Sequence, residues 1–165
     1  MPIFSTLHII MLGLATFLIV GGCAYGKSLN SPSKVNALSK KLGIATIIFW
    51  VTYNIYYFLP GNFKWSVSLP LHVCDIVGLV AGLVMIKPSR QLRAILYFFA
   101  IALTTQALIT PTGNQDPLTA RFWFYWGLHI AILCCSFFDL LFWNGIVFAL
   151  SIRIVPWTTV LMGNI

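Results

Sequence analysis

The sequence predicts an all-α protein: a polytopic transmembrane helix bundle of six spans, forming one domain over residues 1–165. Three observations predict this class. Of the 165 residues, 59% are hydrophobic and 8% are charged, whereas soluble domains carry about 25% charged residues. The mean hydropathy is +0.92. The apolar residues form runs of about 20, the length of a helix that crosses a bilayer. The net charge of +7 is spread between these runs and builds no long basic face, so we expect no nucleic-acid partner.

The first two spans are expected over residues 3–24 and 42–59. No Lys or Arg precedes Lys27, so we expect the first helix to be retained, since a cleaved signal peptide needs a basic start. The longest polar loop is expected over residues 26–41, which hold four lysines, several serines and a proline. The second span ends before a Pro-Gly pair, and the tyrosines in its last turns fit an interfacial aromatic belt.

Four further spans are separated by helix-breaking residues. Lys87-Pro88 ends the third span, Pro111 follows the fourth, and Asn144-Gly145 fits a tight turn after the fifth. The sixth contains Arg153, for which Asp139 is a candidate partner if the last two spans pack as a hairpin. In order, these spans are expected over residues 69–86, 92–110, 121–143 and 146–165.

Lys and Arg are unevenly distributed among the loops. Loops two and four hold only Lys64 and Arg121. By the positive-inside rule the N-terminus then lies outside a cell membrane that the chain crosses several times. Loops one and three, with their flanks, hold most of the basic residues: Lys27, Lys34, Lys40, Lys41, Lys87, Arg90 and Arg93.

Under this orientation the polar residues of the spans gather in the outer half of the bilayer. His72 and Asp75, within the run LPLHVCD, are three residues apart and share a helix face. An intramembrane ionisable pair indicates a functional site. His129 lies eight residues inside the fifth span, about 12 Å along a helix. We therefore take His129, His72 and Asp75 as candidate catalytic residues. Candidate binding residues at the same level are His8, Asn54, Gln106 and Thr110.

A structural interpretation of these polar residues stays open. Buried polar side chains in membrane bundles often hydrogen-bond between helices, and this role is favoured for His8, Asn54 and Gln106. Three histidines and an aspartate are chemically adequate for zinc, but their spacing matches no zinc motif, so metal and cofactor are unknown. Cys23, Cys134 and Cys135 lie in apolar surroundings, and no cysteine pair stands in an evident outer loop, so no disulfide is expected.

Four stretches resemble the YwaF family of bacterial integral membrane proteins: FSTLHIIML, LPLHVCD, TTQALITP and the aromatic entry before Gly127-Leu128-His129. The resemblance covers about five spans in order. It implies a bundle of about seven helices, of which this chain is one short. A distant eukaryotic branch is similar to membrane lipid acyltransferases that pair a nucleophile with a histidine, and His129 would match that histidine. The branch has a cysteine before its span-three histidine, where this chain has Leu71.

Two functions remain open. The first is acyl transfer or hydrolysis on a membrane lipid at an outer-leaflet His/Asp pocket. There His129 or His72 would be the general base, Asp75 would orient it, and Thr105 or Thr110 would be the nucleophile. The second is a proton-linked or small-molecule-linked transporter, or an accessory membrane subunit without catalysis. A structural or assembly protein is the third reading. The expected partner is membrane lipid, and a protein partner or homo-oligomer stays open.

Overall fold

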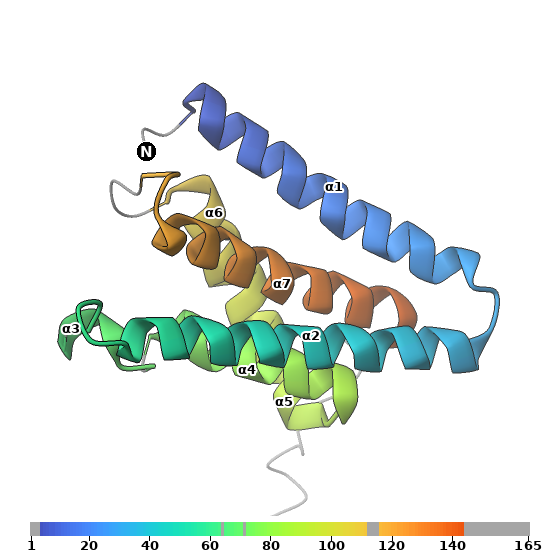
Figure 1. The fold of residues 1–165 in the computed structure, drawn as a ribbon. Helices are drawn as coiled ribbons and strands as arrows, with labels where there is room; N and C mark the ends of the chain where they lie inside the picture. Colours follow the sequence, from blue (N-terminus) through green and yellow to red (C-terminus); the bar gives the residue numbers. More distant parts are fainter. Residues whose placement is uncertain (1–3, 64, 71, 112–115, 144–165) are drawn as a thin grey trace, which may run out of the picture.

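The computed structural model describes residues 4–63, 65–70, 72–111 and 116–143. The regular elements in these residues are all helices, which confirms the all-α class (Figure 1). In chain order they are α1 (Thr6–Ser28), α2 (Pro32–Phe58), α3 (Trp65–Ser68), α4 (Val73–Ile86), α5 (Arg90–Phe99), the π-helical turn η1 (Ala100–Thr104), α6 (Thr105–Ile109) and α7 (Ala120–Trp143).

Three helical stretches in the described residues are long and apolar enough to cross a membrane. They are α1, the continuous α5–η1–α6 stretch over Arg90–Ile109, and α7. α4 is apolar but shorter, at 14 residues. The number of six spans and the side on which the N-terminus lies stay predictions. The sixth predicted span, 146–165, lies outside the described residues, as does the expected pairing partner Arg153.

The expected polar loop over residues 26–41 is wrong. α1 continues to Ser28 and α2 already begins at Pro32, ten residues before the predicted start of the second span. Proline suits the first position of a helix because its missing N–H would have no intrahelical partner there. Lysine is a good helix former, so the polar residues that predicted a loop extend α2 beyond its apolar part.

The third and fourth spans also differ from expectation. The third helix begins at Val73, and His72 is its N-cap, so His72 sits at the helix entrance and not within it. The fourth span is interrupted by η1 between α5 and α6. A single π-helical turn inside an α-helix is frequent at functional sites because it shifts the side chains that follow it around the helix.

α7 is the central helix of the bundle. Figure 1 shows it between α1 and α2. On one side, Leu128, Ile132 and Phe138 pack in a buried cluster with residues of α4, α5 and η1. On the other side, Trp126 and Leu133 pack in a second cluster with α1 and α6. Both clusters therefore share α7, which positions the elements on either side of it.

α2 and α4 cross at two glycines. A Cβ atom on Gly43 would lie 2.7 Å from the backbone oxygen of Gly82, and one on Gly82 would lie 2.5 Å from Cγ1 of Ile47. No side chain fits at either position without displacement of its neighbours. The small residues thus let the two backbones approach closely, as is usual where membrane helices pack.

Candidate functional site

His129 lies in the third turn of α7 and is 4% exposed. Its Nδ1 lies 2.6 Å from the backbone oxygen of Tyr125, one turn earlier on the same helix. A carbonyl oxygen only accepts hydrogen bonds, so this contact places a proton on Nδ1 and leaves the lone pair on Nε2. Among the described residues, no hydrogen bond to Nε2 is formed. The imidazole is therefore oriented through one nitrogen while the other is available to a ligand.

Tyr125 ties this region of α7 to α6. Its hydroxyl donates to the backbone oxygen of Ala107 over 2.6 Å, and its ring centroid lies 4.3 Å from that of His129. The residues preceding Ala107 include the π-helical turn, in which Thr104 is buried, and then the half-buried Thr105. The π-helical turn η1 therefore lies directly before α6, and Tyr125 attaches the part of α7 that carries His129 to α6.

His72 and Asp75 are brought together at the start of α4. Nδ1 of His72 lies 3.3 Å from Oδ2 of Asp75. The His72 side chain is 53% exposed, whereas that of Asp75 is 3% exposed. Oδ2 is buried and accepts no hydrogen bond of good geometry among the described residues, and its contact with His72 is an ion pair only when the imidazole is protonated. A buried carboxylate oxygen without a hydrogen-bond donor lowers the stability of the fold, and it indicates a group that would bind a proton or a ligand.

The α2 helix supports the backbone of this pair. Trp50 Nε1 donates to the backbone oxygen of Asp75 over 2.7 Å. Tyr53, one turn later on α2, lies beside the Asp75 carboxylate. The predicted His72–Asp75 association is therefore observed, and it is fixed to α2 by an indole that sequence spacing did not identify.

His8 has a structural role, because both of its ring nitrogens are hydrogen-bonded. The backbone N–H of Phe4 donates to Nδ1 over 2.9 Å, and Nε2 lies 2.8 Å from the backbone oxygen of Leu108 on α6. The side chain is fully buried and its ring centroid lies 5.9 Å from that of Trp126. His8 thus links the start of α1 to α6 and keeps no nitrogen for a substrate.

Two of the remaining candidate binding residues bond within their own helices. Asn54 Nδ2 donates to the backbone oxygen of Trp50 over 2.8 Å. Thr110 donates from Oγ1 to the backbone oxygen of Gln106 over 2.9 Å, and the side chains of both residues are exposed. These hydrogen bonds satisfy a side-chain donor of Asn54 and of Thr110 within one turn of the same helical stretch.

Within the described residues, no group of three or more His, Cys, Asp or Glu side chains is close enough to hold a metal ion. The four cysteines are all free thiols. The described arrangement therefore offers two separate chemical centres, the oriented imidazole of His129 and the His72–Asp75 pair.

A third buried polar cluster was missed by the sequence analysis. Asp139 on α7 accepts hydrogen bonds from Arg93 and from the hydroxyl of Tyr97, both on α5. The i, i+4 spacing of Arg93 and Tyr97 on one face of a helix was the available signal. The sequence analysis instead places Arg93 among the basic residues of a loop and its flanks, and it gives Arg153 as the candidate partner of Asp139.

Comparison with known proteins identifies one family. The family model described as TMEM164 family matches residues 3–165. No curated protein and no solved structure matches the chain.

This match corrects the resemblance to the YwaF family, since TMEM164 is a different family. The four stretches that carried the resemblance are short, and their order and spacing do not identify the family. The expectation that the chain is one helix short of a seven-helix bundle rested on that resemblance and falls with it.

Proposed function

The chain belongs to the TMEM164 family, and from this premise we propose that it is a membrane protein that acts on an acyl ester of a membrane lipid, by transfer or hydrolysis, with His129 as the general base. The observation that carries the proposal is the state of the His129 imidazole. Nδ1 is held 2.6 Å from the Tyr125 backbone oxygen, so the basic nitrogen is Nε2. A general base must be both oriented and unprotonated at the nitrogen that receives the proton.

The proposed reaction needs no nucleophile from the protein. Nε2 of His129 takes the proton of an acceptor hydroxyl or of water, whose oxygen attacks the ester carbonyl carbon. The new C–O bond forms, the ester C–O bond of the donor lipid breaks, and the proton passes from Nε2 to the departing alkoxide. Transfer to a lipid hydroxyl gives a new ester, and transfer to water gives a free fatty acid. Thr110 is a poor nucleophile for this step because its hydroxyl proton is donated to the Gln106 backbone.

The setting of His129 also supports chemistry on a lipid. The His129 side chain is buried, and α7, the helix that carries it, is long and apolar enough to cross a membrane. A buried site excludes most water, which strengthens electrostatic interactions with the reacting carbonyl. Under the proposal, the exposed His72 and the buried Asp75 meet the polar part of the lipid at the helix entrance. The exposed side chains of Gln106 and Thr110 are further proposed contacts.

Catalysis is tested with the full chain in lipid nanodiscs. The discs contain phosphatidylcholine with a deuterated acyl chain and an unlabelled lysophospholipid as acceptor, and mass spectrometry follows the label. Transfer moves the label into the acceptor lipid, whereas hydrolysis yields labelled fatty acid. If both products stay at the level of empty discs while the chain remains folded, the proposal is wrong.

One observation favours a second function, a proton-linked carrier. Asp75 Oδ2 is buried without a hydrogen-bond donor among the described residues and lies 3.3 Å from His72. Such a pair exchanges a proton readily if its surroundings change. Proteoliposomes with a pH gradient distinguish the two functions. A carrier dissipates the gradient in a way that Asp75→Asn abolishes, whereas a lipid-active enzyme leaves the gradient intact and forms product.

A further inference from the structure

A groove of about 760 Å³ runs along α1 and α7, away from the histidine centres. Its α1 wall consists of six residues that recur at intervals of three and four positions, which places them on one face of the helix. Among the described residues that line it, Lys27 is the only charged one. The residues are Thr16, Ile19, Val20, Cys23, Ala24 and Lys27 on α1, and Phe137, Leu140 and Leu141 on α7.

α1 contacts α7 near both of its ends, and most of the groove lies between these two contacts. Near the start of α1, Met11 and Ala15 are buried in the cluster that includes α7. Near its end, a Cβ atom on Gly26 would lie 2.7 Å from the ring of Phe142, so the two helices touch there. Between these contacts Val20 and Ala24 remain exposed, and only 17% of the most apolar stretch of α1 is buried.

The groove has the length of one bilayer leaflet. From Thr16 to Lys27 there are eleven helical steps, which correspond to about 16 Å at 1.5 Å per residue. The hydrocarbon core of a bilayer is about 30 Å thick, so one leaflet contributes about 15 Å. Lys27 lies in the last turn of α1, at the connection to α2. An acyl chain that filled the groove would therefore bring its headgroup phosphate to the level of the Lys27 ammonium.

From this agreement of length, apolar lining and charge, we propose that the α1–α7 groove binds one acyl chain of a phospholipid whose phosphate is held by Lys27. The groove faces the leaflet on the side of the α1–α2 connection, which the distribution of basic residues predicts to be the cytoplasmic one. His129 and the His72–Asp75 pair do not line it. The inference is thus independent of the proposed catalysis, and either can fail without the other.

The proposal is tested by native mass spectrometry of the delipidated full chain in detergent, titrated with dioleoylphosphatidylglycerol. We expect one phospholipid to bind the wild type with a defined affinity. Lys27→Glu should weaken this binding at least about fivefold, the effect of one basic residue near an anionic headgroup. Ala24→Trp should abolish it by filling the groove. Dioleoylglycerol, which has the chains but no phosphate, should bind the wild type and Lys27→Glu equally.

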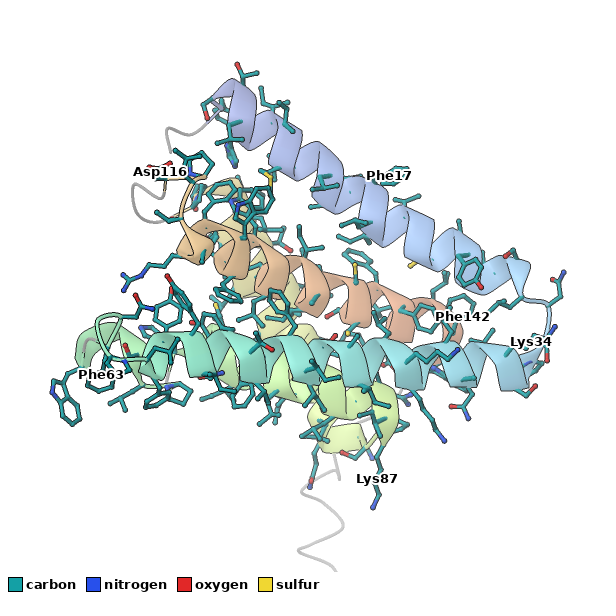
Figure 2. The ribbon with its side chains drawn as sticks, viewed as in Figure 1. Phe17, Lys34, Phe63, Lys87, Asp116 and Phe142 are labelled. Atoms are coloured by element: carbon teal, nitrogen blue, oxygen red, sulfur yellow. The ribbon has the colours of Figure 1, made fainter. Side chains whose placement is uncertain are left out.

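Matched control variants are Lys34→Glu and Phe17→Trp. Lys34 is an exposed lysine of the first turn of α2, at the same end of the bundle, and Phe17 points away from the bundle on the outer side of α1 (Figure 2). Neither residue lines the groove, so both variants should bind phospholipid like the wild type. The proposal is overturned if Lys34→Glu weakens binding as much as Lys27→Glu. It is also overturned if a photo-crosslinker at Val20, in membranes, links to residues 144–165 or to a second copy of the chain and not to phospholipid.

Discussion

Arg93 and Asp139 form a buried ion pair between α5 and α7. Nη2 of Arg93 donates to Oδ1 of Asp139 over 3.0 Å, and Nε lies 3.0 Å from Oδ2. Asp139 is fully buried and Arg93 is 9% exposed. Tyr97 also donates its hydroxyl to the same carboxylate. Opposite charges thus join the α5–η1–α6 stretch to α7, and each of these two stretches is long and apolar enough to cross a membrane.

Breaking this pair from either side should destabilise the bundle strongly. Asp139→Leu leaves a buried guanidinium without its carboxylate, and we expect a loss of about 3–5 kcal/mol in the free energy of unfolding. The double variant Arg93→Met/Asp139→Leu should lose less than the sum of the two single variants, because neither charge is then left alone. Reversible unfolding in mixed micelles measures all three. Additive effects would show that the two residues do not stabilise one another.

Alanine substitutions should distinguish a glycine that is packed at the α2–α4 crossing from a glycine with free space around it. Gly82→Ala places a methyl group 2.5 Å from Ile47 Cγ1, so we expect a lower midpoint of thermal unfolding. Gly21→Ala is the matched control, since a Cβ atom there meets nothing within 4 Å. It should leave stability unchanged or raise it by up to about 1 kcal/mol through helix propensity. Equal shifts for the two variants would contradict the close α2–α4 approach.

Replacement of His8 should weaken the attachment of α1 to α6 and should leave the proposed general base, His129, in place. His8→Ala loses the hydrogen bonds to Phe4 and Leu108, and we expect about 1–3 kcal/mol of destabilisation. His72→Ala is the control at a half-exposed histidine with one weak contact, and its stability should match the wild type. The measurement is the thermal unfolding midpoint in detergent, together with product formation at a temperature where both variants are folded. A folded His8→Ala variant without activity would assign His8 to the reaction.

Much of the fold could be predicted from the sequence, because composition determines the solvent in which this chain folds. The apolar runs located α1, α4 and α7 to within a few residues. The boundary of α2 could not be found in this way, since a helix that leaves the apolar region keeps its backbone hydrogen bonds while its hydropathy falls. The π-helical turn was also missed, because it changes the backbone hydrogen bonding without changing the apolar pattern.

The candidate site could be predicted only where the partners are close in sequence. His72 and Asp75 are three residues apart, and the N-cap position of His72 followed by the first turn of α4 is enough to bring them together. Arg93 and Asp139 are 46 residues apart, and their pairing depends on how α5 rotates against α7, which one sequence does not reveal. The hydrogen bond of His8 to the Leu108 backbone oxygen likewise depends on helix packing, because the two residues are 100 positions apart.

The most direct test of the account is the rate of acyl product formation by wild type and His129→Asn, compared in nanodiscs of the same lipid composition. Asparagine keeps an N–H that can donate to the Tyr125 backbone oxygen but lacks the nitrogen equivalent to Nε2. We predict that His129→Asn unfolds at the wild-type temperature and forms product about 10²–10⁴ times more slowly, the range for loss of a general base. A folded His129→Asn variant with the wild-type rate would contradict the central claim.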